Sequence, residues 1–325
     1  MGLTQSEYDS IMREYEERRL YNAEVIRKRR LELEETLPAY FEIDKKISSA
    51  SMDYFKSQLT SNKMDKEEYH KSIQRFTKEK ESILEKAGYP TDYLEPIYDC
   101  KDCKDTGYIE GEKCHCLKQA AIKKLYPHTN LSNKYQNVSF KHFSLGYYDR
   151  NDNDAKTNLS SFDYAKNALE YCQDFVKNFN STGGNILLYG NTGLGKTYLS
   201  TCIGLELLEQ GYSVLYLTAT QLLDVFEKKM KDRGTSARQD FMLLSEVDLL
   251  IIDDLGTEFQ NSFNIPNVLD CINNRILSEK STVISTNLNL RDLQTCYTER
   301  FISRIVENYK LLRLTGKDIR IQKNL

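Results

Sequence analysis

The sequence lacks long apolar runs, a secretory start and a strong excess of either charge. No run approaches the roughly 20 apolar residues of a membrane-spanning helix, and the first residues lack the charged-then-apolar pattern of a signal peptide. These absences predict a cytoplasmic protein without membrane contact. The formal net charge of −3 neither indicates nor excludes a nucleic-acid partner, because a local basic patch matters more than the total.

The chain has 325 residues, which suggests about two domains, and 40% of them are hydrophobic, which suffices for at least one sizeable core. Three segments with helical apolar spacing come first. One ends before Pro38, one covers residues 40–59, and one runs from near Asp65 to Gly88. All are rich in Glu, Lys and Arg, so we expect long solvated helices. Such a charged hairpin is either a partner-binding arm or a plain spacer.

Eight cysteines in a cytoplasmic chain indicate metal ligands or buried thiols rather than disulfides. Two close pairs flank a glycine-bearing turn: Cys100, Cys103, Cys114 and Cys116. Four thiolates at one point suit tetrahedral Zn²⁺, although an iron–sulfur cluster uses the same ligands and His115 could replace a cysteine. The remaining cysteines lie singly on apolar segments, where we expect core residues: Cys172, Cys202, Cys271 and Cys296.

Residues 190–197 read Gly-Asn-Thr-Gly-Leu-Gly-Lys-Thr, between a strand pattern over residues 185–189 and a helical pattern over residues 198–209. This order is typical of a phosphate-binding loop, in which glycines let backbone N–H groups face phosphate oxygens. Lys196 would reach the β- and γ-phosphates, and the Thr197 hydroxyl would coordinate Mg²⁺. The segment therefore predicts a nucleotide-binding protein.

Two further apolar strand patterns end in polar residues. Residues 247–252 lead into Asp253 and Asp254, and residues 281–286 lead into Asn287. Beside a phosphate loop, Asp253 would hold the Mg²⁺ shell, and Asp254 would orient and activate the attacking water. Asn287 is either a sensor that hydrogen-bonds the γ-phosphate or that water, or a simple turn residue.

Basic residues occur in two places. Arg300 and Arg304 share one face of a predicted helix, where they form surface ion pairs or reach the phosphate of a neighbouring subunit. Residues 221–246 are either a solvated helix face with a basic loop or a surface that neutralises single-stranded DNA phosphates. The side chains concerned in this second segment are Lys228, Lys229, Lys231, Arg233 and Arg238, beside Phe226 and Phe241.

Taken in order, the motifs at residues 190–197, 249–256, 284–287 and 299–305 closely resemble those of the AAA+ ATPases of the DnaC/DnaI helicase-loader and IstB-like group. The resemblance covers roughly residues 135–325, and the cysteine segment is similar to that of clostridial and prophage DnaC-type proteins. It implies an α/β P-loop NTPase domain of three layers with a parallel sheet. It also implies an ATPase that binds ATP or ADP with Mg²⁺.

The resemblance assigns roles residue by residue. Lys196 and Thr197 match Walker A, Asp253 and Asp254 match Walker B, and Asn287 matches sensor 1. Arg304 resembles the arginine finger more closely than Arg300 does, and Arg320 resembles a sensor 2 arginine. The nucleotide-binding set so implied is Gly190, Asn191, Thr192, Gly193, Leu194, Gly195, Lys196, Thr197, Tyr198 and Arg320.

Two departures from the AAA+ pattern matter. Most AAA+ proteins carry glutamate where Asp254 stands, and the shorter side chain predicts weak ATP turnover, stimulated by DNA or a partner. The sequence ends soon after Arg320, which predicts no C-terminal lid. We expect a charged helical partner-binding region over residues 1–92, a four-cysteine metal module over 93–128, a linker over 129–160 and the AAA+ domain over 161–325.

The predicted function is an ATP-dependent loader of the replicative, DnaB-type hexameric DNA helicase. Its N-terminal region would bind the helicase, and its AAA+ domain would bind ATP and single-stranded DNA and form a homo-oligomer with ATP. One alternative is an IstB-like transposition helper ATPase, which binds duplex DNA and a transposase. Another is a nucleotide-dependent interaction protein with negligible hydrolysis.

Overall fold

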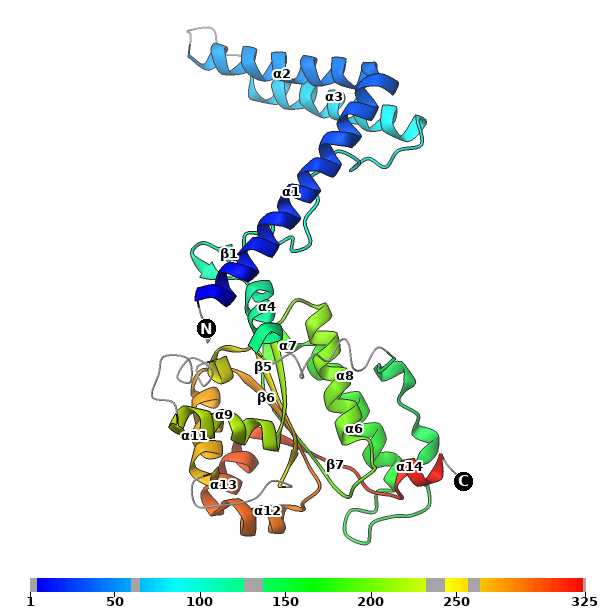
Figure 1. Ribbon diagram of the computed structural model, residues 1–325. Coiled ribbons are helices and arrows are strands. Elements are labelled where there is room, and N and C mark those ends of the chain that lie inside the picture. Colours follow the sequence, from blue (N-terminus) through cyan, green and yellow to red (C-terminus); the bar gives the residue numbers. More distant parts are fainter. Residues whose placement is uncertain (1–4, 60–64, 126–136, 232–242, 257–263, 324–325) are drawn as a thin grey trace. The chain divides into compact units, whose positions relative to one another are not determined.

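The structure, a computed structural model, describes residues 5–59, 65–125, 137–231, 243–256 and 264–323 (Figure 1). The chain divides into two compact units, residues 13–106 in one and residues 1–12 with 107–325 in the other. Within the described ranges, no helix is both long enough and apolar enough to cross a membrane.

Three long helices precede the cysteine segment, as the sequence predicts: α1 (Gln5–Thr36), α2 (Pro38–Gln58) and α3 (Lys66–Lys86). Pro38 takes the first position of α2, where its missing N–H removes no helical hydrogen bond. The Asp65 carboxylate caps the start of α3. Leu33, Tyr40 and Leu84 form the centre of a small buried cluster that holds the helices together.

The larger unit includes a short antiparallel hairpin followed by a helix: β1 (Tyr108–Ile109), β2 (Glu112–Lys113) and α4 (His115–Leu125). Gly107 and Gly111 have φ values of 79° and 87°, which only glycine adopts easily. Gln119 Oε1 accepts a hydrogen bond from the Val214 backbone N–H at 3.1 Å, and Ile122 belongs to the main core. Helix α4 therefore packs on the edge of the central sheet.

A five-stranded parallel sheet forms the middle of this unit, with strand order β4-β5-β6-β3-β7. Its strands are β3 (Asn185–Tyr189), β4 (Val214–Thr218), β5 (Leu249–Leu255), β6 (Ser281–Thr286) and β7 (Tyr309–Arg313). The first four are the predicted strands, and their continuous apolar runs suit a sheet covered on both faces. Strand β7 was not predicted, because it follows a helix without a break and mixes charged with apolar residues.

Helices cover both faces of the sheet, which gives the expected three layers (Figure 1). One face carries α6 (Ser161–Lys177) and α8 (Lys196–Glu209), and the other carries α9 (Ala219–Lys231), α11 (Asn264–Leu277), α12 (Leu290–Tyr297) and α13 (Glu299–Asn308). The short elements are η2 (Phe140–His142), η3 (Leu145–Tyr147), α7 (Phe179–Thr182) and α14 (Ile319–Gln322). Cys172, Cys202 and Cys271 are buried as predicted, whereas Cys296 is only partly buried.

Candidate nucleotide-binding site

The phosphate loop joins β3 to α8 at the carboxyl end of the sheet, where ligands of parallel α/β folds bind. Gly190, Gly193 and Gly195 have φ values of 136°, 75° and 83°, which favour glycine. A Cβ atom on Gly190 would lie 2.0 Å from the carbonyl oxygen of Leu314. Backbone conformation and close packing therefore both require the glycine that the motif supplies.

Lys196 is the first residue of α8, and its side chain is held inside the loop. Its Nζ donates hydrogen bonds to the carbonyl oxygens of Gly190 at 2.7 Å and Asn191 at 2.6 Å. Burial lowers the pKa of Lys196 to about 8, although the nearby charges of Asp254 and Asp253 oppose this effect. The ammonium thus lies near the end of β5, where the motif predicts phosphate contacts.

Asp253 and Thr197 meet, although 56 residues separate them in the chain. The Thr197 hydroxyl donates to Asp253 Oδ1 at 3.1 Å, and Asp253 is only 4% exposed. A hydroxyl and a carboxylate oxygen side by side are the oxygen donors that Mg²⁺ prefers. This donor set fits the predicted magnesium ion.

Asp254 and Asn287 lie at the ends of the adjacent strands β5 and β6. Asn287 Nδ2 donates to Asp254 Oδ1 at 3.3 Å, and the Asp254 N–H donates to Ser285 Oγ at 3.0 Å. Burial, followed by the charge of Asp253, raises the pKa of the Asp254 carboxyl. A raised pKa strengthens a carboxylate as a proton acceptor, which suits a group that activates water.

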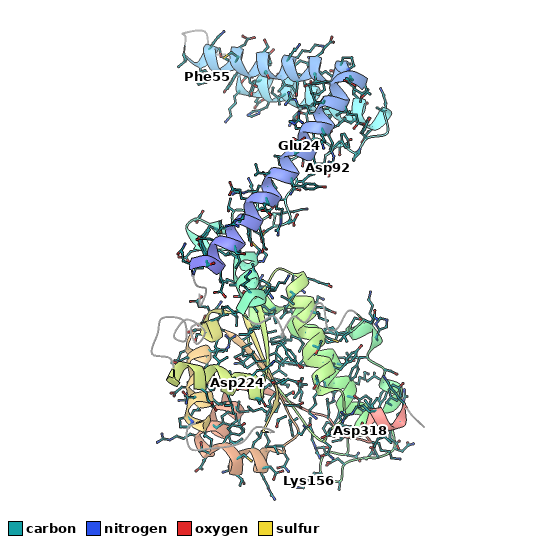
Figure 2. All side chains as sticks on the ribbon, in the orientation of Figure 1. Glu24, Phe55, Asp92, Lys156, Asp224 and Asp318 are labelled. Atoms are coloured by element: carbon teal, nitrogen blue, oxygen red, sulfur yellow. The ribbon has the colours of Figure 1, made fainter. Side chains whose placement is uncertain are left out.

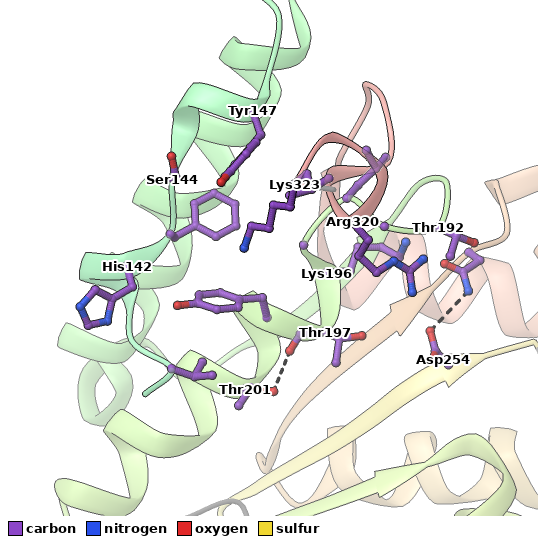
Figure 3. Close-up of a pocket in the computed structure, with 18 residues that line it drawn as sticks. His142, Ser144, Tyr147, Thr192, Lys196, Thr197, Thr201, Asp254, Arg320 and Lys323 are labelled. Atoms are coloured by element: carbon purple, nitrogen blue, oxygen red, sulfur yellow. Dashed lines mark hydrogen bonds between the residues drawn. The ribbon is translucent and has the colours of Figure 1, made fainter. Parts of the chain in front are cut away.

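These elements enclose a cavity of about 370 Å³ (Figure 3). The predicted residues that line it are Thr192, Gly193, Leu194, Gly195, Lys196, Thr197, Tyr198, Asp254, Asn287 and Arg320. The carbonyl oxygens of Gly190 and Asn191 accept hydrogen bonds from the lining residue Lys196. Asp253 accepts one from the lining residue Thr197. The structure therefore brings together the predicted Walker A, Walker B and sensor 1 residues.

Sequence reasoning missed two groups of residues here. Phe143 and Tyr147, from the segment predicted as a linker, line the cavity, and Figure 3 shows Tyr147 at its edge. Tyr216 and Ser285 donate hydrogen bonds to the Asp253 carboxylate. None of these residues belongs to a recognisable motif, because they come from separate segments that only folding brings to the site.

The predicted arginines occupy different places. Arg320, on α14, lines the cavity, and its guanidinium lies 3.0 Å from Asp318 Oδ2. Arg304, on α13, is outside the cavity lining and pairs with Glu307 at 3.2 Å. Arg300 is exposed on the same helix.

The predicted DNA-binding side chains lie outside the described side chains: Lys228, Lys229, Lys231, Arg233, Arg238 and Phe241. Phe226, beside them in the sequence, is fully buried in the core. Its ring is therefore not available to stack on a base.

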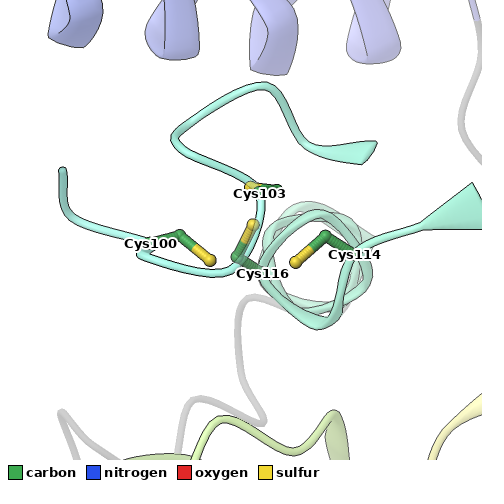
Figure 4. Close-up of side chains that lie close together, drawn as sticks. All are labelled: Cys100, Cys103, Cys114 and Cys116. Carbon is green, nitrogen blue, oxygen red and sulfur yellow. The ribbon is translucent and has the colours of Figure 1, made fainter. Parts of the chain in front are cut away.

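The four predicted metal-binding cysteines lie together within one short segment (Figure 4). The sulfur atoms of Cys100, Cys103, Cys114 and Cys116 all lie within 4.8 Å of one another. A tetrahedral Zn²⁺ with ligands at about 2.3 Å holds its sulfurs just under 4 Å apart, so the donor set fits zinc. An iron–sulfur cluster also uses four thiolates. His115 belongs to a second, smaller group of possible metal ligands, with Cys100 and Asp102.

One protein family matches the second half of this chain, and several known proteins are similar to part of it. The family described as IstB-like ATP binding protein matches residues 154–325. The replicative helicase loader DnaC of Escherichia coli is 30% identical over 139 residues, which are 43% of this chain and 57% of that protein. The DnaC loader of Buchnera aphidicola subsp. Baizongia pistaciae is 25% identical over 189 residues, 58% of this chain and 71% of that protein.

Among solved structures, this chain is similar to that of the DnaC helicase loader, with a TM-score of 0.46, 24% identity and coverage of 56% of this chain and 99% of that chain. The structure of DnaI is also similar, with a TM-score of 0.43, 21% identity and coverage of 47% of this chain and 86% of that chain. The family match covers more than half of the chain and contains the phosphate loop, both acids and Asn287. This chain therefore belongs to the IstB-like ATP binding protein family, and it has the parallel sheet and phosphate loop of a P-loop NTPase.

Proposed function

We propose that this protein is an ATP-dependent loader of a replicative hexameric DNA helicase of the DnaB type. One observation carries the proposal. A phosphate loop, two strand-end acids and an asparagine meet at or beside one cavity, in a chain that is similar to replicative helicase loaders over 43% and 58% of its length.

Different residues around the cavity bind the nucleotide and act in its hydrolysis. Lys196 and the loop N–H groups hold the triphosphate, and Thr197 and Asp253 hold Mg²⁺, which neutralises charge on the phosphates. Asp254 orients and activates the attacking water, with Asn287 holding its carboxylate. ATP acts mainly as a timing switch for release of the helicase.

Weak hydrolysis is part of the proposal, because Asp254 has one methylene less than the glutamate of most AAA+ proteins. Arg304 is the better candidate for an arginine finger, because it resembles that residue of the family more closely than Arg300 does. Both arginines lie outside the cavity of their own chain, and Arg304 would complete the site of a neighbour in an ATP-bound homo-oligomer. A nucleotide-dependent interaction protein with negligible hydrolysis remains the second candidate, favoured by the same short carboxylate.

The helical unit supplies the helicase contact in this proposal. Met52, Phe55 and Leu59 are 55%, 63% and 74% exposed. Their spacing puts them on one side of the end of α2, with Leu59 as its C-cap residue, and Figure 2 shows Phe55 there. Exposed apolar side chains grouped on one helix face are typical of partner-binding surfaces. The basic residues of segment 221–246 would bind single-stranded DNA.

The remaining predictions stand as part of this proposal. The cysteine segment binds Zn²⁺ or an iron–sulfur cluster, the protein works in the cytoplasm, and the four regions have the limits expected from the sequence. The similarity of the cysteine segment to DnaC-type proteins favours a loader over a transposition helper.

ATP turnover tests the enzymatic half of the proposal. Purified protein should hydrolyse ATP slowly, and faster with single-stranded DNA or helicase. Lys196→Ala should abolish nucleotide binding, and Asp254→Ala should abolish turnover while retaining binding. If no turnover responds to these substitutions under any condition, the protein is a nucleotide-dependent interaction protein instead.

Co-purification tests the partner. The chain of 325 residues should capture the hexameric helicase of its own organism, and Phe55→Glu should weaken this capture. Leu277→Glu is a matched control, because Leu277 is 82% exposed in the other unit. Binding of a transposase and duplex DNA in place of the helicase would support the transposition helper.

A further inference from the structure

Three hydroxyl groups donate hydrogen bonds to the buried carboxylate of Asp253. Tyr216 Oη donates to Oδ2 at 2.5 Å, and Thr197 Oγ1 donates to Oδ1 at 3.1 Å. Ser285 Oγ also donates to Oδ1. Thr197 belongs to the phosphate loop, but the other two residues come from β4 and β6, on either side of β5.

Tyr216 is held firmly where it stands. It is 7% exposed and packs in the core cluster between the sheet and helix α8, with Leu199 and Ile203. Strand β4 pairs in register with β5, with Tyr216 opposite Ile251. A buried aromatic ring has few rotamers, so its hydroxyl is fixed relative to the end of β5.

A carboxylate that serves Mg²⁺ must present the correct oxygen in the correct direction. Residues that hydrogen-bond a metal-binding carboxylate fix its orientation and tune the affinity for the metal. A donor on Oδ2 prevents the carboxylate from rotating, and a donor on Oδ1 from the opposite side restrains it further. Hydrogen bonds to an ionised acceptor are also stronger than neutral ones.

We propose that Tyr216, together with Ser285, is a positioning residue for the magnesium site. Their hydroxyls hold the Asp253 carboxylate in the orientation that the ion requires, and neither residue lines the cavity. This inference rests on the proposed Mg²⁺–nucleotide complex at this cavity. It assigns a function to two residues that lie outside the recognised motifs.

Tyr216→Phe keeps the ring and removes only the hydroxyl. The primary measurement is a Mg²⁺ titration of the protein with a fluorescent ATP analogue. We expect the midpoint to rise by about tenfold or more, the usual effect of losing such a support. Affinity for the same nucleotide in EDTA should not change. A second readout is the electron paramagnetic resonance spectrum of Mn²⁺ in the complex, which should show weaker Mn²⁺ binding.

Two further variants separate positioning from simple packing. Tyr297→Phe removes another buried tyrosine hydroxyl, one with no hydrogen-bond partner among the described residues, and should leave the titration unchanged. In an Asp253→Asn background, Tyr216→Phe should have no further effect on the midpoint, because the carboxylate through which it acts is gone. Ser285→Ala should shift the midpoint in the same direction, which keeps the test available if Tyr216→Phe folds poorly.

The possible results distinguish this inference from the proposed function. If the wild-type protein binds nucleotide with Mg²⁺ but Tyr216→Phe and Ser285→Ala titrate as it does, only the positioning role is overturned. An equal loss of affinity in EDTA would also overturn it, because the effect would then be on nucleotide binding. If the wild-type protein binds no nucleotide with or without Mg²⁺, both proposals fail.

Discussion

Asn287 Nδ2 donates a hydrogen bond to Asp254 Oδ1 at 3.3 Å and so joins the ends of two neighbouring strands. Asp254 itself has a φ of 56°, an uncommon backbone conformation for a residue other than glycine. Strain of this kind persists where surrounding structure enforces it, often at functional sites. Asn287 thus contacts the acid proposed to act on water, and the γ-phosphate is not its only possible partner.

Asp254→Asn should lower the ATP turnover number by about 10²-fold or more, because the amide cannot accept the proton of the attacking water. The affinity for Mg²⁺–ATP should remain within a few-fold of wild type. Asn287→Ala should lower turnover less, because it removes a support of the acid but not the acid. Steady-state turnover and equilibrium nucleotide binding, measured on the same preparations, check both. Equal turnover in the wild-type protein and both variants would contradict the roles assigned to Asp254 and Asn287.

Gly190→Ala should abolish nucleotide binding and lower the free energy of unfolding. Its new Cβ would lie 2.0 Å from the backbone oxygen of Leu314, at a φ of 136°. Gly183→Ala is the control, because its φ of 50° is also positive but no atom lies within 4 Å of the added carbon. Gly183→Ala should lower the free energy of unfolding only by the backbone strain, about 1 to 3 kcal/mol, and should not change nucleotide binding. Calorimetry with and without ATP tests both variants.

Arg275→Met should destabilise the larger unit by about 3 to 5 kcal/mol, because several buried acceptors would lose their donor at about 1 to 3 kcal/mol each. Arg275 is fully buried and donates to the carbonyl oxygens of Leu244 and Ser281, each at 2.5 Å, and to Thr282 Oγ1 at 3.0 Å. Methionine would leave these acceptors unsatisfied. Arg291→Met, at an exposed position, should change chemical denaturation little. A similar effect of both substitutions would be inconsistent with this account.

The ion pair of Asp248 and Lys280, at 2.7 Å, should make stability depend on pH. Burial would raise the pKa of Asp248, but hydrogen bonds from Lys280 and Ser213 outweigh it and hold that pKa below its ordinary value. The pair therefore stabilises the folded state above the unfolded pKa of about 4 and loses this effect as the pH falls through the folded value.

Lys280→Met should therefore cost about 2 kcal/mol at pH 7 and less near pH 3. Urea denaturation of the variant and the wild-type protein at both pH values tests this. If the free energy of unfolding differs between the two proteins by the same amount at both pH values, the Asp248–Lys280 pair does not cause the pH dependence.

Metal analysis tests the cysteine segment. We expect about one zinc ion per chain, or a coloured protein with iron and sulfide if the site holds a cluster. Cys116→Ser should lower the bound metal strongly. Cys296→Ser, at a cysteine of similar partial exposure outside the group, should not. A chain that binds no metal after purification without chelators would disprove the metal proposal.

The sequence alone determined most of the nucleotide site. The order of glycines, Lys196 and Thr197, and strands that end in Asp253 and Asn287, predicts both the elements and their meeting point. The reason is that parallel strands deliver their carboxyl ends to one edge of the sheet. The N-terminal helices and the group of four cysteines could also be predicted from the sequence, because both patterns depend on local spacing.

Only the tertiary structure decided what surrounds these motifs. Leu314, directly after β7, and Asp318, directly before α14, lie against Gly190 and Gly193 from more than 120 residues away in the chain. Tyr216 reaches Asp253 across the sheet, and Phe143 reaches the cavity from a segment that looked like a linker. Such contacts have no fixed spacing along the chain, since strand order and packing create them. The motifs therefore predict the groups that meet the nucleotide, and the fold selects the side chains that hold those groups in place.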